Sequence, residues 1–282
     1  MPESQDLPTL VAALRVGQAR RVNLLSLAGR VGFVTGAGQG VGRQIAFHLA
    51  AHEAKAVVVT DYHLDRADSV AREIETAGAT ALALRCDVTD YEDVVAAIAC
   101  ATDRFGSLDV LVNNAGNSGA AGLDLNQPPF WETEPKDWAP WVEVNFTGVL
   151  HCARAAVPGM VQRRHGRIIT IVSDAGRTGE PHLVVYSGAK AGAAGFTRGL
   201  AKAVGRYNIT ANCIALASML TPATEHLIED AERVRRMLQR YVIRRFGDPA
   251  DAANMVVFLA SDAAAWITGQ TYPVNGGYSF AL

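Results

Sequence analysis

Two side chains able to share a proton stand four residues apart in the run Tyr-Ser-Gly-Ala-Lys, at Tyr186 and Lys190. On an α-helix, residues i and i+4 lie on the same face, so the phenol and the ammonium group would be neighbours. A free tyrosine has a pKa of about 10, and a lysine cation beside it favours the phenolate and lowers that pKa toward the range of a general base. Surface helices also produce this spacing by chance, so the rest of the chain must support the interpretation.

A glycine-rich turn lies near the start of the chain, in the run Thr-Gly-Ala-Gly-Gln-Gly-Val-Gly at residues 35–42. It joins a short apolar run, a predicted strand, to a predicted helix. Glycine permits a tight turn and a close approach of a ligand, and the free N–H groups of a helix N-terminus bind phosphate. The alternative is that these glycines serve only turn geometry. We predict a pyrophosphate site with contacts from Gly36, Gln39, Gly40, Val41 and Gly42.

Carboxylates end the next two predicted strands. Asp61 stands nineteen residues after Gly42, where a carboxylate accepts the hydroxyls of an adenosine ribose and repels a 2′-phosphate. Because no arginine or lysine directly follows it, we expect NAD as cofactor, with NADP less favoured. The alternative role of Asp61 is a helix N-cap or a turn at the strand end. Asp87, with Val88 beside it, is expected near the adenine, unless its carboxylate only caps a turn.

Small and polar residues follow the fourth and fifth predicted strands. Asn114, Ala115 and Gly116 would let the chain pass beneath a cofactor. Ser173 follows the fifth strand, and its hydroxyl could donate to a carbonyl oxygen and stabilise developing charge; taken alone it is an ordinary loop serine. Asp174 is the rival acidic group. Because an unpaired anion beside a tyrosinate would raise the tyrosine pKa, we interpret Asp174 as a loop carboxylate.

The elements that must position these residues alternate between short apolar runs and longer helical patterns. Buried strands separated by helices indicate a parallel sheet covered on both faces, and ligands of such folds bind beyond the carboxyl ends of the strands. We therefore predict an α/β fold, a doubly wound Rossmann-type sheet of about seven strands in a single domain. Strands are expected at 30–35, 56–60, 81–86, 110–112, 167–172, 210–214 and 270–273, and helices at 42–52, 64–77, 91–105, 138–161 and 189–207.

Two segments stand outside this alternation. Residues 1–27 are expected to form an N-terminal extension, either an appendage that packs on the domain or a neighbouring subunit, or a flexible tail. The domain itself would cover 28–282. Within it, residues 218–246 are polar, helical in pattern and without a predicted strand, which indicates a lid.

Composition excludes several classes of protein. With 282 residues, 49% of them hydrophobic, and a net charge of −2, the chain suits a globular domain and gives no bulk charge for binding nucleic acid. No apolar run reaches the roughly 20 residues that span a membrane. The four cysteines are scattered and form no metal-ligand pattern, so we expect reduced thiols, no metal and a cytoplasmic location.

Together, in this order and spacing, these motifs resemble the short-chain dehydrogenase/reductase family over about nine-tenths of the chain. The matching elements are the turn at 35–42, Asn-Asn-Ala-Gly at 113–116, Asn145 in Val-Asn-Phe-Thr-Gly, Ser173, and the Tyr186–Lys190 pair. The resemblance implies that Tyr186 is the acid/base and Ser173 orients the substrate oxygen. It also implies that Lys190 lowers the tyrosine pKa and holds the nicotinamide ribose, and that Asn145 kinks its helix and positions a water.

The sequence departs from the family pattern in two loops. After the sixth strand the family usually has Pro-Gly, whereas this chain has Leu-Ala at 216–217; Met219 and Thr221 still stand where the family contacts the nicotinamide. The segment 119–138 is a longer loop, and its aromatic residues Phe130 and Trp131 either wall the substrate cleft or pack in a surface fold of their own.

The resemblance implies an NAD-dependent oxidoreductase that interconverts a secondary alcohol and a ketone, with an alicyclic alcohol or a hydroxyacyl thioester as substrate. A 3-oxoacyl-thioester reductase is the alternative, and a non-catalytic dinucleotide-binding sensor is the alternative from another class. Arginines in the predicted lid would bind thioester phosphates or, as interleaved acids suggest, form solvated salt bridges. The family also implies a homo-oligomer, a dimer or a tetramer.

Overall fold

The computed structural model describes residues 23–116, 128–222 and 224–280. Within them lies one sheet of seven parallel strands, in the order β3-β2-β1-β4-β5-β6-β7, as the sequence predicts. The strands are β1 Val31–Val34, β2 Ala56–Asp61, β3 Ala81–Arg85, β4 Val110–Asn113, β5 Gly166–Ser173, β6 Ile209–Leu216 and β7 Thr271–Val274. Because all seven run in one direction, Asp61, Asn113 and Ser173 end their strands at the same edge of the sheet.

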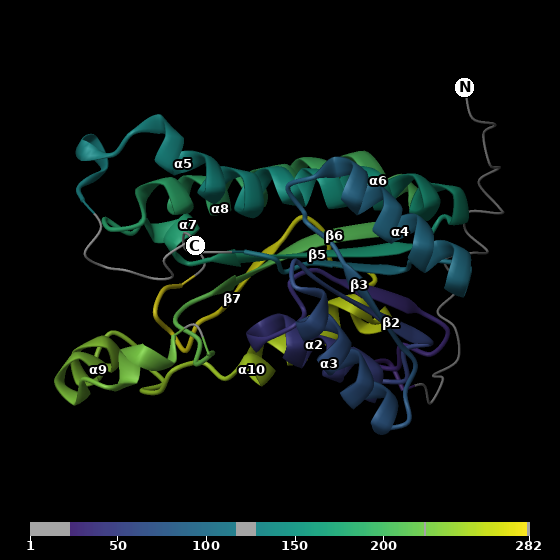
Figure 1. The fold of residues 1–282 in the computed structure, drawn as a ribbon, viewed down its shortest axis with the longest axis horizontal. Helices are drawn as coiled ribbons and strands as arrows, with labels where there is room; N and C mark the ends of the chain where they lie inside the picture. The colour runs from purple at the N-terminus through teal and green to yellow at the C-terminus, as the bar shows by residue number, and fades with distance from the viewer. Residues whose placement is uncertain (1–22, 117–127, 223, 281–282) are drawn as a thin grey trace, which may run out of the picture.

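Helices cover both faces of this sheet (Figure 1). On one face lie α2 (Gly40–Ala51), α3 (Leu64–Thr76) and α10 (Pro249–Ala260), and on the other lie α4 (Tyr91–Phe105), α6 (Gly148–Arg163) and α8 (Val184–Val204). The central strands are mostly apolar and are buried along almost their whole length, which is what a sheet with two helical layers requires. The resulting framework is rigid where the strand ends must present side chains.

The helix expected at 138–161 is divided in the structure. α5 (Pro135–Val142) leads into a π-helical segment, η2 (Glu143–Thr147), before α6 begins at Gly148. Asn145 sits in the π segment, fully buried. A π segment inserts an extra residue into a helical turn and is frequent at functional sites. The helix is therefore interrupted at the residue that the family resemblance marks as a kink.

Two expected helix starts were wrong. α8 begins at Val184, more than a turn earlier than the expected Ala189, so Tyr186 and Lys190 both lie on it. α2 begins at Gly40, inside the glycine-rich turn, where a positive φ of 55° makes glycine the favoured residue. The periodic apolar pattern marks the buried part of a helix, whereas these first turns face the functional edge of the sheet.

The segment expected as a lid carries two short helices, η4 (Glu225–Ile228) and α9 (Ala231–Leu238), at one end of the molecule (Figure 1). Its two ends meet, since Met219 forms an isolated bridge with Gly247 and the Leu220 N–H donates to the Gly247 carbonyl at 2.8 Å. The first 22 residues of the expected N-terminal extension lie outside the described residues. Among the helices of the described part, none is long and apolar enough to cross a membrane.

Candidate active site

The carboxyl edge of the sheet brings the predicted acid/base pair together on α8. The Lys190 side chain is 4% exposed, its Nζ donates to the Ile171 carbonyl at 2.9 Å, and it stands 5.8 Å from the centre of the Tyr186 ring. Ser173 ends β5 and hydrogen-bonds with the Tyr186 hydroxyl. A phenol, an alcohol and an ammonium group therefore lie near one another at this edge of the sheet.

Burial controls the ionisation of this pair. It raises the pKa of the Tyr186 phenol, and the hydrogen bond with Ser173 works in the opposite direction. It lowers the pKa of the Lys190 ammonium to about 8. The expected dominance of Lys190 over the tyrosine pKa is therefore absent from this structure. Loss of hydration outweighs the other influences on the half-buried phenol, and Tyr186 stays protonated at neutral pH.

Asn145 and Lys190 converge on Gly116, the last residue of the motif after β4. A Cβ placed on Gly116 would lie 3.0 Å from Asn145 Oδ1 and 3.2 Å from Lys190 Nζ. The Asn145 Nδ2 donates to the carbonyl of Trp141 at 2.9 Å, which fixes the amide. Gly116 thus leaves open the space that both polar groups face, at the point where a cofactor would pass.

The glycine-rich turn is held against β4 by Asn114. Its Nδ2 donates to the carbonyl oxygens of Thr35 and Gly36 at 2.9 and 3.0 Å. A Cβ on Gly42 would lie 2.3 Å from the Gly36 oxygen and 2.4 Å from Asn114 Nδ2. Such distances leave no room for a side chain, so Gly42 permits the close turn that opens α2. Val41 lies in the first turn of this helix, and Ala115 packs against Gly36.

Asp61 faces this turn from the end of β2. Its Oδ2 accepts from the Gly38 N–H at 3.0 Å and its Oδ1 from the His63 N–H at 3.0 Å, so the carboxylate does shape the turn. Each oxygen retains a second lone pair for a ribose hydroxyl. The sequence analysis missed Arg66, which is five residues further on but has its Cβ only 2.6 Å from where a Gly38 Cβ would stand. The Asp61 Oδ2 lies 2.7 Å from the same position, so the start of the Arg66 side chain and the Asp61 carboxylate both border Gly38.

The other residues expected to contact the cofactor differ in whether their side chains are already engaged within the protein. The Asp87 carboxylate accepts from the N–H and hydroxyl of Thr89 at 3.0 and 2.7 Å, as in the alternative interpretation of a turn cap. Val88 is buried against Gly148. Thr221 reaches the glycine-rich turn, since its Cγ2 lies 3.4 Å from the Cβ position of Gly40. The loop after β6 therefore closes over the turn despite the Leu-Ala at 216–217.

Met219 anchors this loop by burial rather than by a polar contact. Its side chain is 7% exposed, and its carbonyl accepts from the Thr224 hydroxyl at 2.6 Å. The Thr221 N–H donates to the same hydroxyl at 2.9 Å. Gln39 precedes α2 as its N-cap residue without a side-chain capping bond.

An aromatic ring that the sequence analysis did not select lies against Tyr186. The Trp141 ring packs edge to face on it, with 5.7 Å between ring centres. The expected wall residues pack elsewhere: Phe130 stacks on Trp138 at 5.3 Å, and Trp131 is 81% exposed. In residues 128–138, the described part of the long loop, these contacts support the alternative of a surface fold, whereas residues 119–127 lie outside the described residues. The available sequence signal for Trp141 was its place one turn before Asn145.

Asp174 is not a free loop carboxylate. It is 2% exposed and its Oδ1 pairs with the Arg177 guanidinium at 2.6 Å. The argument that an unpaired anion would disturb Tyr186 therefore does not apply, because a cation accompanies this anion.

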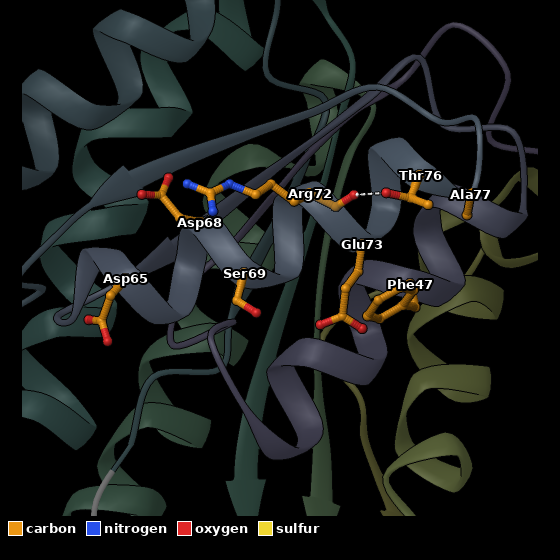
Figure 2. Close-up of a pocket in the computed structure, with 8 residues that line it drawn as sticks. All are labelled: Phe47, Asp65, Asp68, Ser69, Arg72, Glu73, Thr76 and Ala77. Carbon is orange, nitrogen blue, oxygen red and sulfur yellow. Dashed lines mark hydrogen bonds between the residues drawn. The ribbon is translucent and has the colours of Figure 1, made fainter.

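A hollow of about 680 Å³ lies between α2 and α3, in the helical layer on the other face of the sheet from α8. Figure 2 shows Glu73 of α3 beside Phe47 of α2, while Arg72 extends along α3 toward Asp68. The residues that line this hollow do not include Tyr186, Ser173 or Lys190. In the described part of the chain, no three His, Cys, Asp or Glu side chains are grouped so as to hold a metal ion.

The chain matches one protein family model and is similar in sequence to known proteins. A family model described as enoyl-(acyl carrier protein) reductase matches residues 36–279. A 3-oxoacyl-[acyl-carrier-protein] reductase of Synechocystis sp. is 38% identical over 255 residues, which cover 90% of this chain and 98% of the relative.

Two solved structures resemble this one closely. One is a 7α-hydroxysteroid dehydrogenase complexed with NADH and 7-oxo glycochenodeoxycholic acid, 37% identical, with a TM-score of 0.84 over 90% of this chain and 96% of that one. The other is a gluconate 5-dehydrogenase of Burkholderia cenocepacia with NADP and tartrate, 32% identical, with a TM-score of 0.85 over 92% and 99% of the two chains.

The doubly wound sheet, the glycine-rich turn and the Tyr186–Ser173–Lys190 cluster define a nucleotide-dependent oxidoreductase. The chain belongs to the short-chain dehydrogenase/reductase family. It is an oxidoreductase that acts on CH–OH groups and interconverts an alcohol and a ketone.

Proposed function

We propose that this enzyme interconverts an alicyclic secondary alcohol and its ketone with NAD(H), using Tyr186 as acid/base. The observation that carries the proposal is the grouping of Tyr186 with the Ser173 hydroxyl, which hydrogen-bonds with it, and with the Lys190 ammonium, 5.8 Å from its ring centre and next to Gly116. A nicotinamide bound there supplies or accepts the hydride.

The residues of this chain would handle the proton and the oxygen. Ser173 donates a hydrogen bond to the substrate oxygen and holds it near Tyr186. In reduction, the protonated phenol gives its proton to the oxygen as negative charge develops there. In oxidation, the phenolate removes the hydroxyl proton. Lys190 would hold the nicotinamide ribose and stabilise the phenolate. Asn145, which lies next to Gly116, would position a water molecule that returns a proton to Tyr186.

The glycine-rich turn and the start of α2 would hold the pyrophosphate, with contacts from residues 36 and 39–42. Asn114, Ala115 and Gly116 would lie beneath the cofactor, Asp87 and Val88 near the adenine, and Met219 and Thr221 near the nicotinamide. The absence of a side chain at Gly42 supports this fit. It lets the turn close tightly at the N-terminus of α2, where free N–H groups can bind phosphate.

For the cofactor we infer a preference for NAD over NADP. The buried Asp61 carboxylate faces the turn where the adenosine ribose would lie, and a 2′-phosphate would meet its charge. Both NADH and NADP occur in the similar solved structures, so this chain's own carboxylate is the ground for the choice.

Replacing Asp61 with serine should lower the preference for NADH over NADPH by at least about ten-fold, equal to about 1.4 kcal/mol, because the like-charge repulsion is removed. Arg66, whose side chain starts next to Gly38, is the basic residue that we then expect to meet the phosphate. The ratio of kcat/KM for the two cofactors measures this, with Asp65→Ser, at an exposed carboxylate in the first turn of α3, as control. A wild-type enzyme that prefers NADPH would contradict the assignment.

For the substrate, two observations favour a cyclic ketone over a thioester. The Trp141 ring beside Tyr186 offers an apolar surface to a ring system. Three arginines expected to meet phosphates are engaged within the chain: Arg236 with Glu232, Arg245 with Asp251, and Arg240 with the Tyr278 hydroxyl. The 3-oxoacyl-thioester reductase remains the second candidate because a relative carries that name.

A direct comparison of two ketones tests this choice. The kcat/KM for a 7-oxo bile acid should exceed that for acetoacetyl-CoA by at least about ten-fold, as expected when a pocket binds one transition state better than another. NADH oxidation is the readout. A higher value for acetoacetyl-CoA that falls steeply in Arg240→Ala and Arg244→Ala would instead establish the thioester reductase.

We also propose a homo-oligomer in the cytoplasm. The exposed apolar side chains Val242, Ile243 and Phe280 lie near the end of the edge strand β7, which supports a contact with a second copy. Cys86, Cys152 and Cys213 are buried free thiols, which supports the cytoplasmic location. Sedimentation at several protein concentrations would reveal a monomer if the oligomer is wrong.

A further inference from the structure

The carboxylate of Asp174, directly after Ser173, is one of the most enclosed charges in the described structure. Three groups donate to it: Arg177 Nη1 at 2.6 Å and Ser279 Oγ at 3.0 Å to Oδ1, and Asn275 Nδ2 at 2.6 Å to Oδ2. A buried carboxylate is costly unless it is paired and fully hydrogen-bonded. Its retention beside the acid/base centre therefore needs a reason.

The backbone of Asp174 fixes the first turn after β5. Its N–H donates to the Leu216 carbonyl at 2.9 Å, and its carbonyl accepts from the N–H groups of Arg177 and Thr178, both at 2.8 Å. The Ser173 hydroxyl in turn accepts from the Ala175 N–H at 3.1 Å. The position of the Ser173 oxygen therefore depends on the turn that Asp174 holds.

Two of the partners of Asp174, Asn275 and Ser279, come from the C-terminal segment, residues 275–280, about a hundred positions along the chain. Arg177 donates to Ser279 Oγ at 2.7 Å and to the Phe280 carbonyl at 2.8 Å. Asn275 Nδ2 also donates to the Ser279 carbonyl at 2.9 Å. These bonds hold the C-terminal segment against α7 (Ala175–Thr178), the short helix that starts at this turn.

The same segment is tied on its other side to the end of the 218–246 region. The Ile243 N–H donates to the Gly276 carbonyl at 2.8 Å, and Arg240 bonds the Tyr278 hydroxyl. The Tyr241 ring packs on Tyr278 with 5.3 Å between centres, while its hydroxyl accepts from the Ser218 N–H at 3.1 Å. The C-terminal segment thus connects the expected lid to the Ser173 turn.

We propose that Asp174 is a positioning residue, through which the C-terminal segment 275–280 holds the Ser173 hydroxyl in its place beside Tyr186. This inference rests on the proposed role of Ser173. Asp174 acts through the turn and its hydrogen bonds, and the Arg177 guanidinium balances its charge.

Ionisation of Tyr186 provides a readout that a loss of general stability would not move. Two polar groups face Tyr186, the Ser173 hydroxyl from β5 and the Lys190 ammonium from its own helix. The neutral Trp141 ring packs against it from α5. The Asp174–Arg177 pair lies one residue beyond Ser173. The Ser173 hydrogen bond lowers the Tyr186 pKa, so displacement of that hydroxyl raises it.

Asp174→Asn should lower kcat for ketone reduction by about 10- to 100-fold, the scale expected when a group that orients the substrate is displaced. The ascending limb of the pH profile for alcohol oxidation should move to higher pH, and the dissociation constant of NADH, measured by fluorescence, should stay unchanged. Ser279→Ala should show the same signs with smaller size. Glu73→Gln, which breaks the exposed pair with Arg43, serves as the matched control and should equal wild type.

Arg177→Gln and Asp174→Asn should be non-additive, because both remove the same connection. Wild-type kcat and pH profile in Asp174→Asn and Ser279→Ala would overturn the inference, as would a loss of NADH affinity equal to the loss of kcat. If Asp174→Asn does not fold, Ser279→Ala decides alone. If wild type reduces no ketone, the proposed function fails separately. Hydrogen exchange over 173–179 in Ser279→Ala then decides, and unchanged exchange would overturn the inference.

Discussion

Replacement of Tyr186 with phenylalanine should lower kcat by about 10²- to 10⁴-fold, the range that a general acid/base contributes. The ring, its edge-to-face contact with Trp141 and the burial of the helix face remain, and only the proton-carrying oxygen is lost. NADH affinity, measured by fluorescence titration, should be unchanged, because the pyrophosphate and ribose contacts are proposed elsewhere.

Tyr207→Phe is the matched control, since that tyrosine lies at the far end of α8, beyond its last turn, and should leave kcat unaltered. Substantial activity in Tyr186→Phe would remove this residue from the mechanism. Joint loss of kcat and NADH binding would show that the substitution disturbs the site as a whole, and the acid/base assignment would lose its support.

The second large effect is expected at Gly42. Replacement with alanine places a methyl group 2.3 Å from the Gly36 oxygen, a backbone atom of the turn, and 2.4 Å from Asn114 Nδ2, the side-chain amide that holds the turn. Because the Gly36 oxygen belongs to the backbone, the turn must shift. We expect the dissociation constant of NADH to rise by at least about 100-fold, near 2.7 kcal/mol, through loss of the pyrophosphate contacts.

Gly199→Ala is the matched control for this substitution. Gly199 lies in α8 with no atom within 4 Å of its Cβ position, so alanine there fits and favours the helix. Unchanged NADH affinity in Gly42→Ala, with circular dichroism like wild type, would contradict a cofactor site at this turn.

Much of the framework could be predicted from sequence because burial leaves a pattern. The runs that became β1, β2, β5 and β6 are apolar at most positions, and a glycine-rich run marks the turn after β1. Since all the strands are parallel, residues that follow them must share one edge. That simple rule placed Asp61, Ser173 and the Asn114–Gly116 motif together before any contact was known.

What escaped prediction depends on contacts between distant parts of the chain. Trp141 reaches Tyr186 from another helix, and its residue type alone does not distinguish it from Trp131 or Trp138. Asp174 finds its partners Asn275 and Ser279 a hundred residues away, so the sequence showed it without its pairing. The balance at Tyr186 also needed coordinates, because desolvation depends on how deeply the ring is enclosed.

The central claim is that hydride passes directly between a dinucleotide and a carbonyl carbon beside Tyr186 and Ser173. Reduction of a 7-oxo bile acid and of acetoacetyl-CoA with NADH deuterated at C4 of the nicotinamide, in both configurations, tests this most directly. We predict that mass spectrometry finds deuterium on the new carbinol carbon from one configuration, with product lost in Tyr186→Phe. Product whose carbinol hydrogen comes from solvent, or the same labelled product at the wild-type rate from Tyr186→Phe, would contradict the account.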